Sequence, residues 1–92
     1  MYTLVFTNRM KRDLKLAKKR GKDISKIETV LEILLSGNDL PEIYKDHQLK
    51  GEMREFRECH IEPDWLLIYR KDDTELILYT TATGTHADLF DM

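Results

Sequence analysis

The chain has 92 residues, of which 41% are hydrophobic and 35% are charged, and its formal net charge is −2. Because so short a chain supplies only one core, we predict a single domain over residues 1–92 and exclude a disordered protein. The longest apolar run, Trp65 to Tyr69, is too short to span a bilayer, and seven Lys or Arg among the first 20 residues exclude a secretory signal. With the lone Cys59, these features predict a cytoplasmic protein with no membrane segment.

Charge is unevenly distributed along the chain. Residues 1–26 hold nine Lys or Arg against two Asp, a local balance of +7, whereas the rest of the chain carries −9. Such an asymmetry indicates an anionic partner for the first part, and nucleic acid is the leading candidate. A basic helix face is also common as plain solvated surface, so charge alone leaves both interpretations open.

The N-terminal part predicts a strand followed by a hairpin of two helices. Residues 2–7 are rich in aromatic and β-branched side chains, and Thr7 or Asn8 then caps a helix that Gly21 ends. Asp23 or Ser25 starts a second helix, with Ser25 and Glu28 in the form of a capping box. Each helix carries one apolar stripe: Met10, Leu14 and Ala17 in the first, and Ile24, Ile27, Leu31, Leu34 and Leu35 in the second.

The rest of the chain predicts a sheet for this hairpin to cover. Strands at about residues 53–61, 65–71 and 75–81 are separated by turn-forming residues, and their short connections make neighbours antiparallel. With residues 2–7 they give an α+β fold, in which a two-helix hairpin packs on a mainly antiparallel four-stranded sheet. The connection over residues 38–52 is long enough to be functional.

All three histidines lie after residue 46, each within two positions of a carboxylate. In the strand over 53–61, a period of two places Glu58 and His60 on one face, where the carboxylate favours an imidazolium suited to a general acid or a phosphate contact. An exposed ion pair explains the same pattern. A zinc set is a further alternative, but the close spacing typical of metal motifs is lacking, so we predict no metal and no cofactor.

Three segments carry a family resemblance. They are YKDHQLKG at residues 44–51, FRECHIEPDWLLIY at 56–69 and TGTHADLF at 83–90. In order and spacing they resemble the YafQ-like toxins of the RelE superfamily, and the basic first helix agrees. The resemblance implies a RelE-like fold and a ribosome-dependent endoribonuclease that cleaves mRNA in the ribosomal A site by metal-independent acid–base catalysis. It also implies a DinJ-like antitoxin as partner, beside the 70S ribosome and mRNA.

The resemblance assigns roles to individual residues. It implies catalytic roles for four residues: His47, His60, Asp64 and His86. It implies a substrate-binding set in which Trp65 and Phe90 stack on nucleotides and Glu58 occupies a position that is Asp in the relative. We add Arg57 to this set as a candidate phosphate contact. The basic first helix would follow ribosomal RNA phosphate with Lys11, Arg12, Lys15, Lys18, Lys19 and Arg20.

The sequence departs from the family at Ala82, where the resemblance leads us to expect an arginine that pairs with phosphate. This departure predicts a catalytically attenuated toxin unless Arg57, Arg70 or Lys50 serves instead. Two other function classes stay open. One is a ParE-type toxin that binds DNA gyrase without cutting RNA, against which the histidines argue. The other is a nontoxic nucleic-acid-binding module, for which the basic helix suffices.

Overall fold

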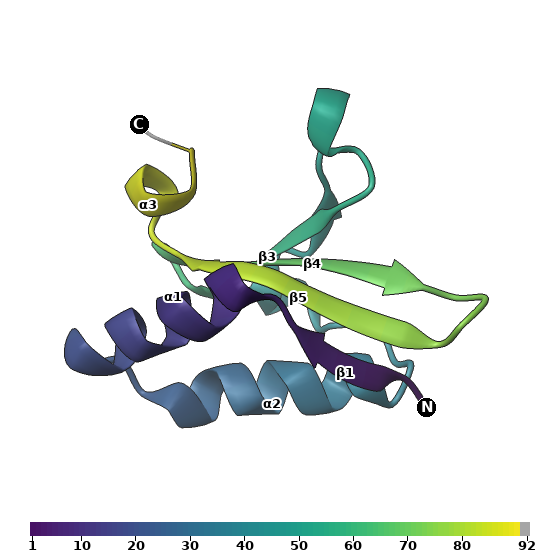
Figure 1. Ribbon diagram of the computed structural model, residues 1–92, viewed down its shortest axis with the longest axis horizontal. Coiled ribbons are helices and arrows are strands. Elements are labelled where there is room, and N and C mark those ends of the chain that lie inside the picture. The colour runs from purple at the N-terminus through teal and green to yellow at the C-terminus, as the bar shows by residue number, and fades with distance from the viewer. Residues whose placement is uncertain (91–92) are drawn as a thin grey trace.

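A mixed five-stranded sheet forms the centre of the molecule in the computed structural model, which describes residues 1–90 (Figure 1). The strands lie in the order β1-β5-β4-β3-β2, and β1 pairs with β5 in parallel while the other pairs are antiparallel. The strands are β1 (Thr3–Phe6), β2 (His47–Gln48), β3 (Arg57–Glu62), β4 (Trp65–Asp72) and β5 (Ile77–Gly84). The helices are α1 (Asn8–Lys19), α2 (Ile24–Leu35) and α3 (His86–Phe90), with short 3-10 turns at Glu42–Tyr44 and Gly51–Met53.

Side-chain caps set the starts of the two long helices. The Thr7 hydroxyl accepts a hydrogen bond from the Met10 amide at 3.0 Å, as predicted for the first helix. For the second helix the cap is Asp23, whose carboxylate accepts from the Ser25 amide at 3.0 Å. The predicted capping box from Ser25 to Glu28 is wrong, because Ser25 already lies inside the helix and its own hydroxyl also donates to Asp23.

The hydrophobic core lies between these helices and one face of the sheet, which Figure 1 shows with α1 and α2 on the same side. Met10, Ile27 and Leu34 are at most 1% exposed, and they pack in one cluster with Cys59 and Trp65 from the strands. Burying a large apolar side chain contributes about 1.5–3 kcal/mol, so this interface stabilises the fold. The predicted α+β arrangement of a helix hairpin on a mainly antiparallel sheet is confirmed.

The predicted strand count and several boundaries are wrong. The sheet has a fifth strand, β2, because His47 and Gln48 of the predicted connection pair with Glu58 and Arg57. The strand expected over 53–61 begins only at Arg57, since the segment before it forms a 3-10 turn. The strand expected over 75–81 is β5, which runs further along the chain to Gly84 and is followed directly by α3.

Within residues 1–90, the opposite face of the sheet carries no long helix. Figure 1 shows α3 and the segment around residues 49–56 rising from this face at two separate places. Among the helices within residues 1–90, none combines the length and the hydropathy needed to cross a membrane.

Candidate active site

Strand register gathers the predicted site residues on the sheet face away from α1 and α2. His47 of β2 is the partner of Glu58, and Glu58 is the partner of Ile68 in β4. His60 lies two residues further along β3, so by the alternation of a strand it shares this face with Glu58. The prediction that Glu58 and His60 lie on one face is confirmed, and the structure adds His47 beside them.

Glu58 is a buried carboxylate between two imidazoles. Its side chain is 7% exposed, and its Oε1 lies 3.4 Å from His60 Nε2 and 3.6 Å from His47 Nε2. The other ring nitrogen of each histidine faces a backbone carbonyl: Lys45 O at 2.8 Å for His47 and Pro63 O at 3.2 Å for His60. Every nitrogen of these two rings therefore faces a carbonyl or carboxylate oxygen.

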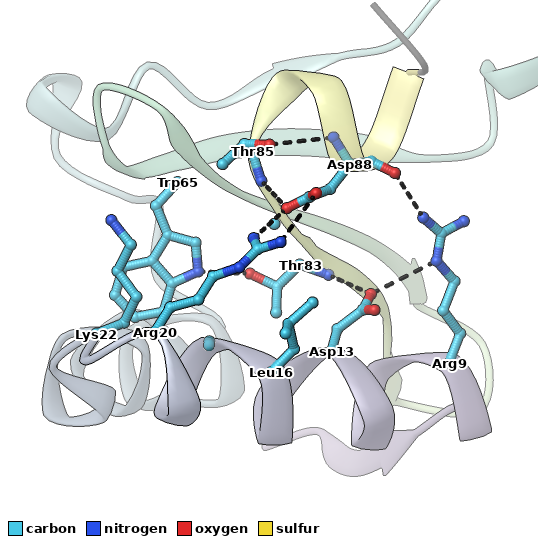
Figure 2. Close-up of a pocket in the computed structure, with 11 residues that line it drawn as sticks. Arg9, Asp13, Leu16, Arg20, Lys22, Trp65, Thr83, Thr85 and Asp88 are labelled. Atoms are coloured by element: carbon cyan, nitrogen blue, oxygen red, sulfur yellow. Dashed lines mark hydrogen bonds and ion pairs between the residues drawn. The ribbon is translucent and has the colours of Figure 1, made fainter.

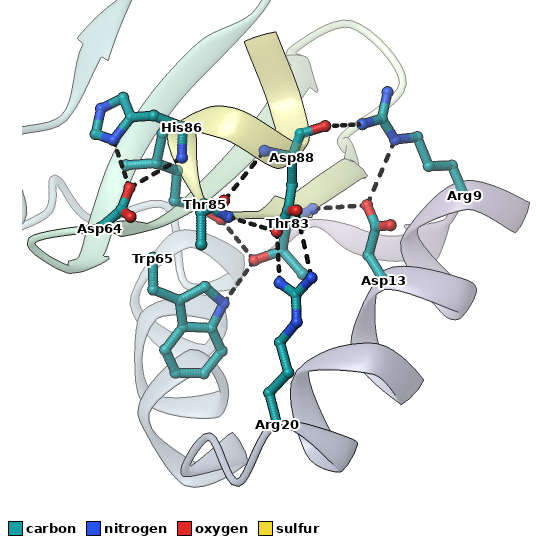
Figure 3. A network of polar contacts seen from close by, with 10 residues as sticks. Arg9, Asp13, Arg20, Asp64, Trp65, Thr83, Thr85, His86 and Asp88 are labelled. Atoms are coloured by element: carbon teal, nitrogen blue, oxygen red, sulfur yellow. Dashed lines mark hydrogen bonds and ion pairs between the residues drawn. The ribbon is translucent and has the colours of Figure 1, made fainter. Parts of the chain in front are cut away.

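His86 joins the cluster from the first position of α3. Asp64, in the turn between β3 and β4, accepts from the His86 amide at 2.9 Å and lies 2.7 Å from His86 Nδ1 (Figure 3). The bond from the His86 amide, followed by the bond from its ring, lowers the pKa of the Asp64 carboxyl. Asp64 engages Nδ1, and the Nε2 of His86 has no hydrogen-bond partner within residues 1–90.

The three histidines, which are far apart in sequence, form one group with His60 in the middle. The ring centres of His60 and His86 are 5.7 Å apart, and those of His47 and His60 are 6.5 Å apart. A single phosphodiester can contact two such rings at once, because a proton-transfer group needs to come within about 2.6–3.2 Å of the atom it serves. Neighbouring rings in this group are therefore close enough to act on one phosphodiester.

The same side chains could also hold a metal ion. Ligand atoms of Glu58, His60 and His86 all lie within 4.8 Å of one another. Two imidazoles and a carboxylate are a donor set that Zn²⁺ and Cu²⁺ accept. Sequence spacing missed this set because its members come from β3 and α3, not from one helix or one short loop.

Trp65, which was predicted to stack on a nucleotide, is buried. Its side chain is 1% exposed within the core, and its indole N–H donates to the Thr83 hydroxyl at 2.9 Å. A nucleobase needs an open ring face, so the interpretation of Trp65 as a stacking residue is wrong. Phe90 lies in α3 and is partly exposed, which keeps it available to a substrate.

The Arg57 side chain lies on the core side of the sheet. It precedes Glu58 in β3 and therefore points to the opposite face. Its guanidinium donates to Asp46 at 3.0 and 3.2 Å, and the same carboxylate accepts from the Tyr69 hydroxyl at 2.5 Å. Arg57 thus holds the segment before His47 in place, and its charge is directed away from the histidines.

A second group of polar residues lies beside the histidines and surrounds a cavity of about 200 Å³ between α1, β5 and α3 (Figure 2). Arg20, one of the predicted RNA contacts, donates to the Asp88 carboxylate at 2.6 and 3.4 Å. This arginine, ahead of the Thr85 amide, lowers the pKa of Asp88. Sequence reasoning missed the pair because 68 residues separate its members.

Comparison with known proteins identifies the family. A family model described as "Bacterial toxin of type II toxin-antitoxin system, YafQ" matches residues 2–91. The chain belongs to this YafQ family. It is 42% identical over 86 residues to the mRNA interferase toxin YafQ of Escherichia coli K12, covering 92% of this chain and 91% of that protein.

Solved structures agree with this membership of the YafQ family. The fold matches the crystal structure of the E. coli DinJ-YafQ complex with a TM-score of 0.90 and 38% identity, covering 98% of this chain and 99% of that chain. A metal-bound toxin from Helicobacter pylori matches with a TM-score of 0.92 and 38% identity, over 98% of this chain and 100% of that chain.

Ala82, at the position where an arginine is expected, lies in the same cross-strand row as Glu58. Glu58 pairs with Ile68, and Ile68 pairs with Ala82. Ala82 is 2% exposed, so its methyl group fills a small space on the sheet face that carries Glu58 and His60. We call this face the histidine face. By strand alternation Arg70 also lies on this face. Its guanidinium carbon stacks over the Tyr79 ring, 4.1 Å from the ring centre.

Proposed function

We propose that this chain is a ribosome-dependent endoribonuclease toxin that cuts mRNA by acid–base catalysis at His47, His60, Asp64 and His86. The observation that carries the proposal is that three imidazoles from β2, β3 and α3 lie side by side, two of them against the buried carboxylate of Glu58. The relatives named mRNA interferase support the reaction type.

The reaction needs three groups. A base takes the proton from a ribose 2′-hydroxyl, whose oxygen forms a bond to phosphorus. A cation stabilises the charge on the crowded phosphate, and an acid gives a proton to the 5′-oxygen as its bond to phosphorus breaks. The expected products are a 2′,3′-cyclic phosphate and a 5′-hydroxyl. Every atom and proton is accounted for by the side chains and the RNA.

The hydrogen bonds suggest how these roles divide. His86 has its Nδ1 held by Asp64 and its Nε2 open, which suits the group that exchanges a proton with the substrate. His60 and His47 face Glu58 and carbonyl oxygens, which suits cations that stabilise phosphate and supply the leaving-group proton. Phe90 is proposed to stack on a displaced base.

The exposed face of α1 supplies the proposed ribosome contact. Five of the six predicted basic residues keep this role, and all are exposed: Lys11, Arg12, Lys15, Lys18 and Lys19. Lys and Arg on one helix face bind RNA phosphate and release counterions, so binding should weaken as salt rises. Arg20 is left out because Asp88 occupies its guanidinium.

The remaining partners follow from the relatives. Since the E. coli relative is found in a complex with DinJ, we propose that a DinJ-like antitoxin neutralises this chain. A toxin that acts on ribosomes would work in the cytoplasm, which we propose as its location.

The test is to add the purified chain to ribosomes programmed with a defined mRNA and to map the cut by primer extension. We expect a cut within the A site and none in free mRNA. A gyrase supercoiling assay runs in parallel, because intact mRNA with inhibited supercoiling would establish the ParE-type alternative.

A further inference from the structure

The position of His86 depends on a helix that has almost no packing of its own. α3 has five residues, and none of them is buried. So short a helix is not stable by itself, because nucleation costs more than a single turn of hydrogen bonds returns. Beside the half-buried Leu89 and Phe90, polar contacts at its ends and side hold it in place.

One set of contacts closes the start of α3. The Thr85 hydroxyl accepts from the Asp88 amide at 3.1 Å, and the Asp88 carboxylate accepts from the Thr85 amide at 3.0 Å. This is a reciprocal cap of the kind that fixes a helix start. The cap requires Gly84, because a Cβ at that position would lie 2.9 Å from both Cβ and Oδ2 of Asp88.

A second set of contacts joins α3 to α1. The Arg20 guanidinium donates to both Asp88 carboxylate oxygens, at 2.6 and 3.4 Å, and Arg9 donates to the Asp88 carbonyl at 3.3 Å (Figure 3). On the same side, the Asp13 carboxylate accepts from the Thr83 amide at 3.1 Å and fixes the end of β5. Arg9 and Asp13 lie in the first half of α1, and Arg20 follows its last residue.

We propose that Arg20, Arg9 and Asp88 form an α1–α3 latch that positions the His86 imidazole for RNA cleavage. This role rests on the proposed function. Asp88 is the central member, since one carboxylate both caps α3 and receives Arg20. Asp64 orients the His86 ring from one side, and the latch holds the backbone that carries the ring from the other. Arg20 is thus a positioning residue, distinct from its basic neighbours on α1.

The test uses Arg20→Ala and Asp88→Asn, with Arg20→Lys as the conservative variant and Arg12→Ala as the contrasting arginine on α1. Single-turnover cleavage on programmed ribosomes gives the rate constant at saturation and the half-saturating ribosome concentration. Misplacement of a catalytic group by about 1 Å can cost a hundredfold, so we expect Arg20→Ala to lower the rate constant by about ten- to a hundredfold. Its half-saturating concentration should change less than about twofold, and Arg20→Lys should recover part of the rate.

Arg12→Ala should give the opposite pattern, with weaker ribosome binding as its main effect. A double-mutant cycle adds a second criterion: Arg20→Ala should add little to Asp88→Asn, because both remove the same contact. Arg20→Ala with an unchanged rate constant and a raised half-saturating concentration would overturn the latch and return Arg20 to RNA binding.

A second measurement needs no ribosome and separates the latch from the proposed function. ¹⁵N-resolved NMR of the histidine rings reports whether His86 Nδ1 keeps its proton facing Asp64. We expect one fixed tautomer in the wild type and an averaged ring in Arg20→Ala, while His47 keeps its signals. If the wild type cuts no mRNA, the proposed function fails; if the His86 signals are the same in both proteins, the latch fails.

Discussion

The two faces of the sheet differ in what their residues do, although both are built from the same strands. In β3, Cys59 and Ile61 enter the core beneath the helices, whereas Glu58 and His60 face the other way and meet His47. The helix face is closed by apolar packing. The histidine face also buries Leu66, Ile68 and Ala82, but it adds the ion pairs and hydrogen bonds of its histidines. Alternation along one strand thus separates stability from chemistry, which predicts that substitutions on each face have different effects.

The largest effect should come from removing an imidazole on the histidine face. His86→Ala and His60→Ala should each lower the cleavage rate constant by about 10²- to 10⁴-fold, the usual contribution of a proton-transfer group. Ribosome binding should stay near wild type in both variants, and so should the melting temperature of His86→Ala, whose side chain lies outside the core cluster. His60→Ala also removes a partner of the buried Glu58 carboxylate, so its rate constant is corrected for the folded fraction. Cleavage at the wild-type rate would remove the substituted residue from the mechanism.

A core substitution should show the reverse pattern. Leu34 is 1% exposed, so Leu34→Ala leaves a cavity beneath the sheet and should cost about 2–5 kcal/mol of unfolding free energy. Urea denaturation measures that loss. Rate constants corrected for the folded fraction should match the wild type, and a selective loss of cleavage would show that the two faces are coupled.

Asp64→Asn should affect both cleavage and stability, and the sign of its pH dependence follows from the pKa of Asp64. Asp64→Asn should lower cleavage by about tenfold, because the ring of His86 loses a charged hydrogen-bond partner. The pKa of Asp64 is lowered in the folded chain, chiefly by the His86 amide. Its stabilisation is therefore present above the ordinary carboxyl range and lost as pH falls through the lowered pKa. The melting temperatures of the two proteins should differ at pH 7 and converge below about pH 4.

Ala82→Arg should strengthen the histidine face. A guanidinium in the row of Glu58 would reach the reacting phosphate, and charge-assisted pairs are about twice as strong as neutral ones. We expect cleavage to rise about tenfold at saturating ribosomes. The matched control is Arg70→Gln, which removes the guanidinium of another arginine on the same face, one that stacks on the Tyr79 ring. An unchanged rate in Ala82→Arg would show that the alanine does not attenuate this toxin.

The smallest effects should come from single charges on the outer face of α1. Arg12→Gln should leave the rate constant at saturation near wild type and reduce the salt dependence of ribosome binding by about one unit of slope. Binding measured at several salt concentrations provides the slope. An unchanged slope would show that Arg12 does not contact phosphate.

Much of the fold follows from local patterns. The apolar stripes of α1 and α2 and the alternation in β3 predicted the helix hairpin, the core face and the pairing of Glu58 with His60. The two-residue strand β2 escaped prediction, because only its pairing with β3 makes it a strand. α3 also escaped, although Thr85 and Asp88 have the spacing of a cap and could have indicated a helix start.

The site was predicted less completely, because burial and long-range pairing decide what a side chain can do. Trp65 has the residue type of a stacking platform but fills the core, and Arg20 has the type of an RNA contact but binds Asp88. His47, His60 and His86 were identified by resemblance, and only the tertiary structure shows that their rings adjoin.

The central claim is that this histidine face cuts RNA through the ribose 2′-hydroxyl. The most direct measurement is cleavage of a ribosome-bound mRNA that carries a single 2′-deoxyribose at the cut nucleotide, compared with the all-ribose mRNA. Loss of cleavage at that nucleotide, with a 2′,3′-cyclic phosphate on the all-ribose product, is the predicted result. Continued cleavage of the deoxy-substituted mRNA, leaving a 3′-hydroxyl, would contradict the account.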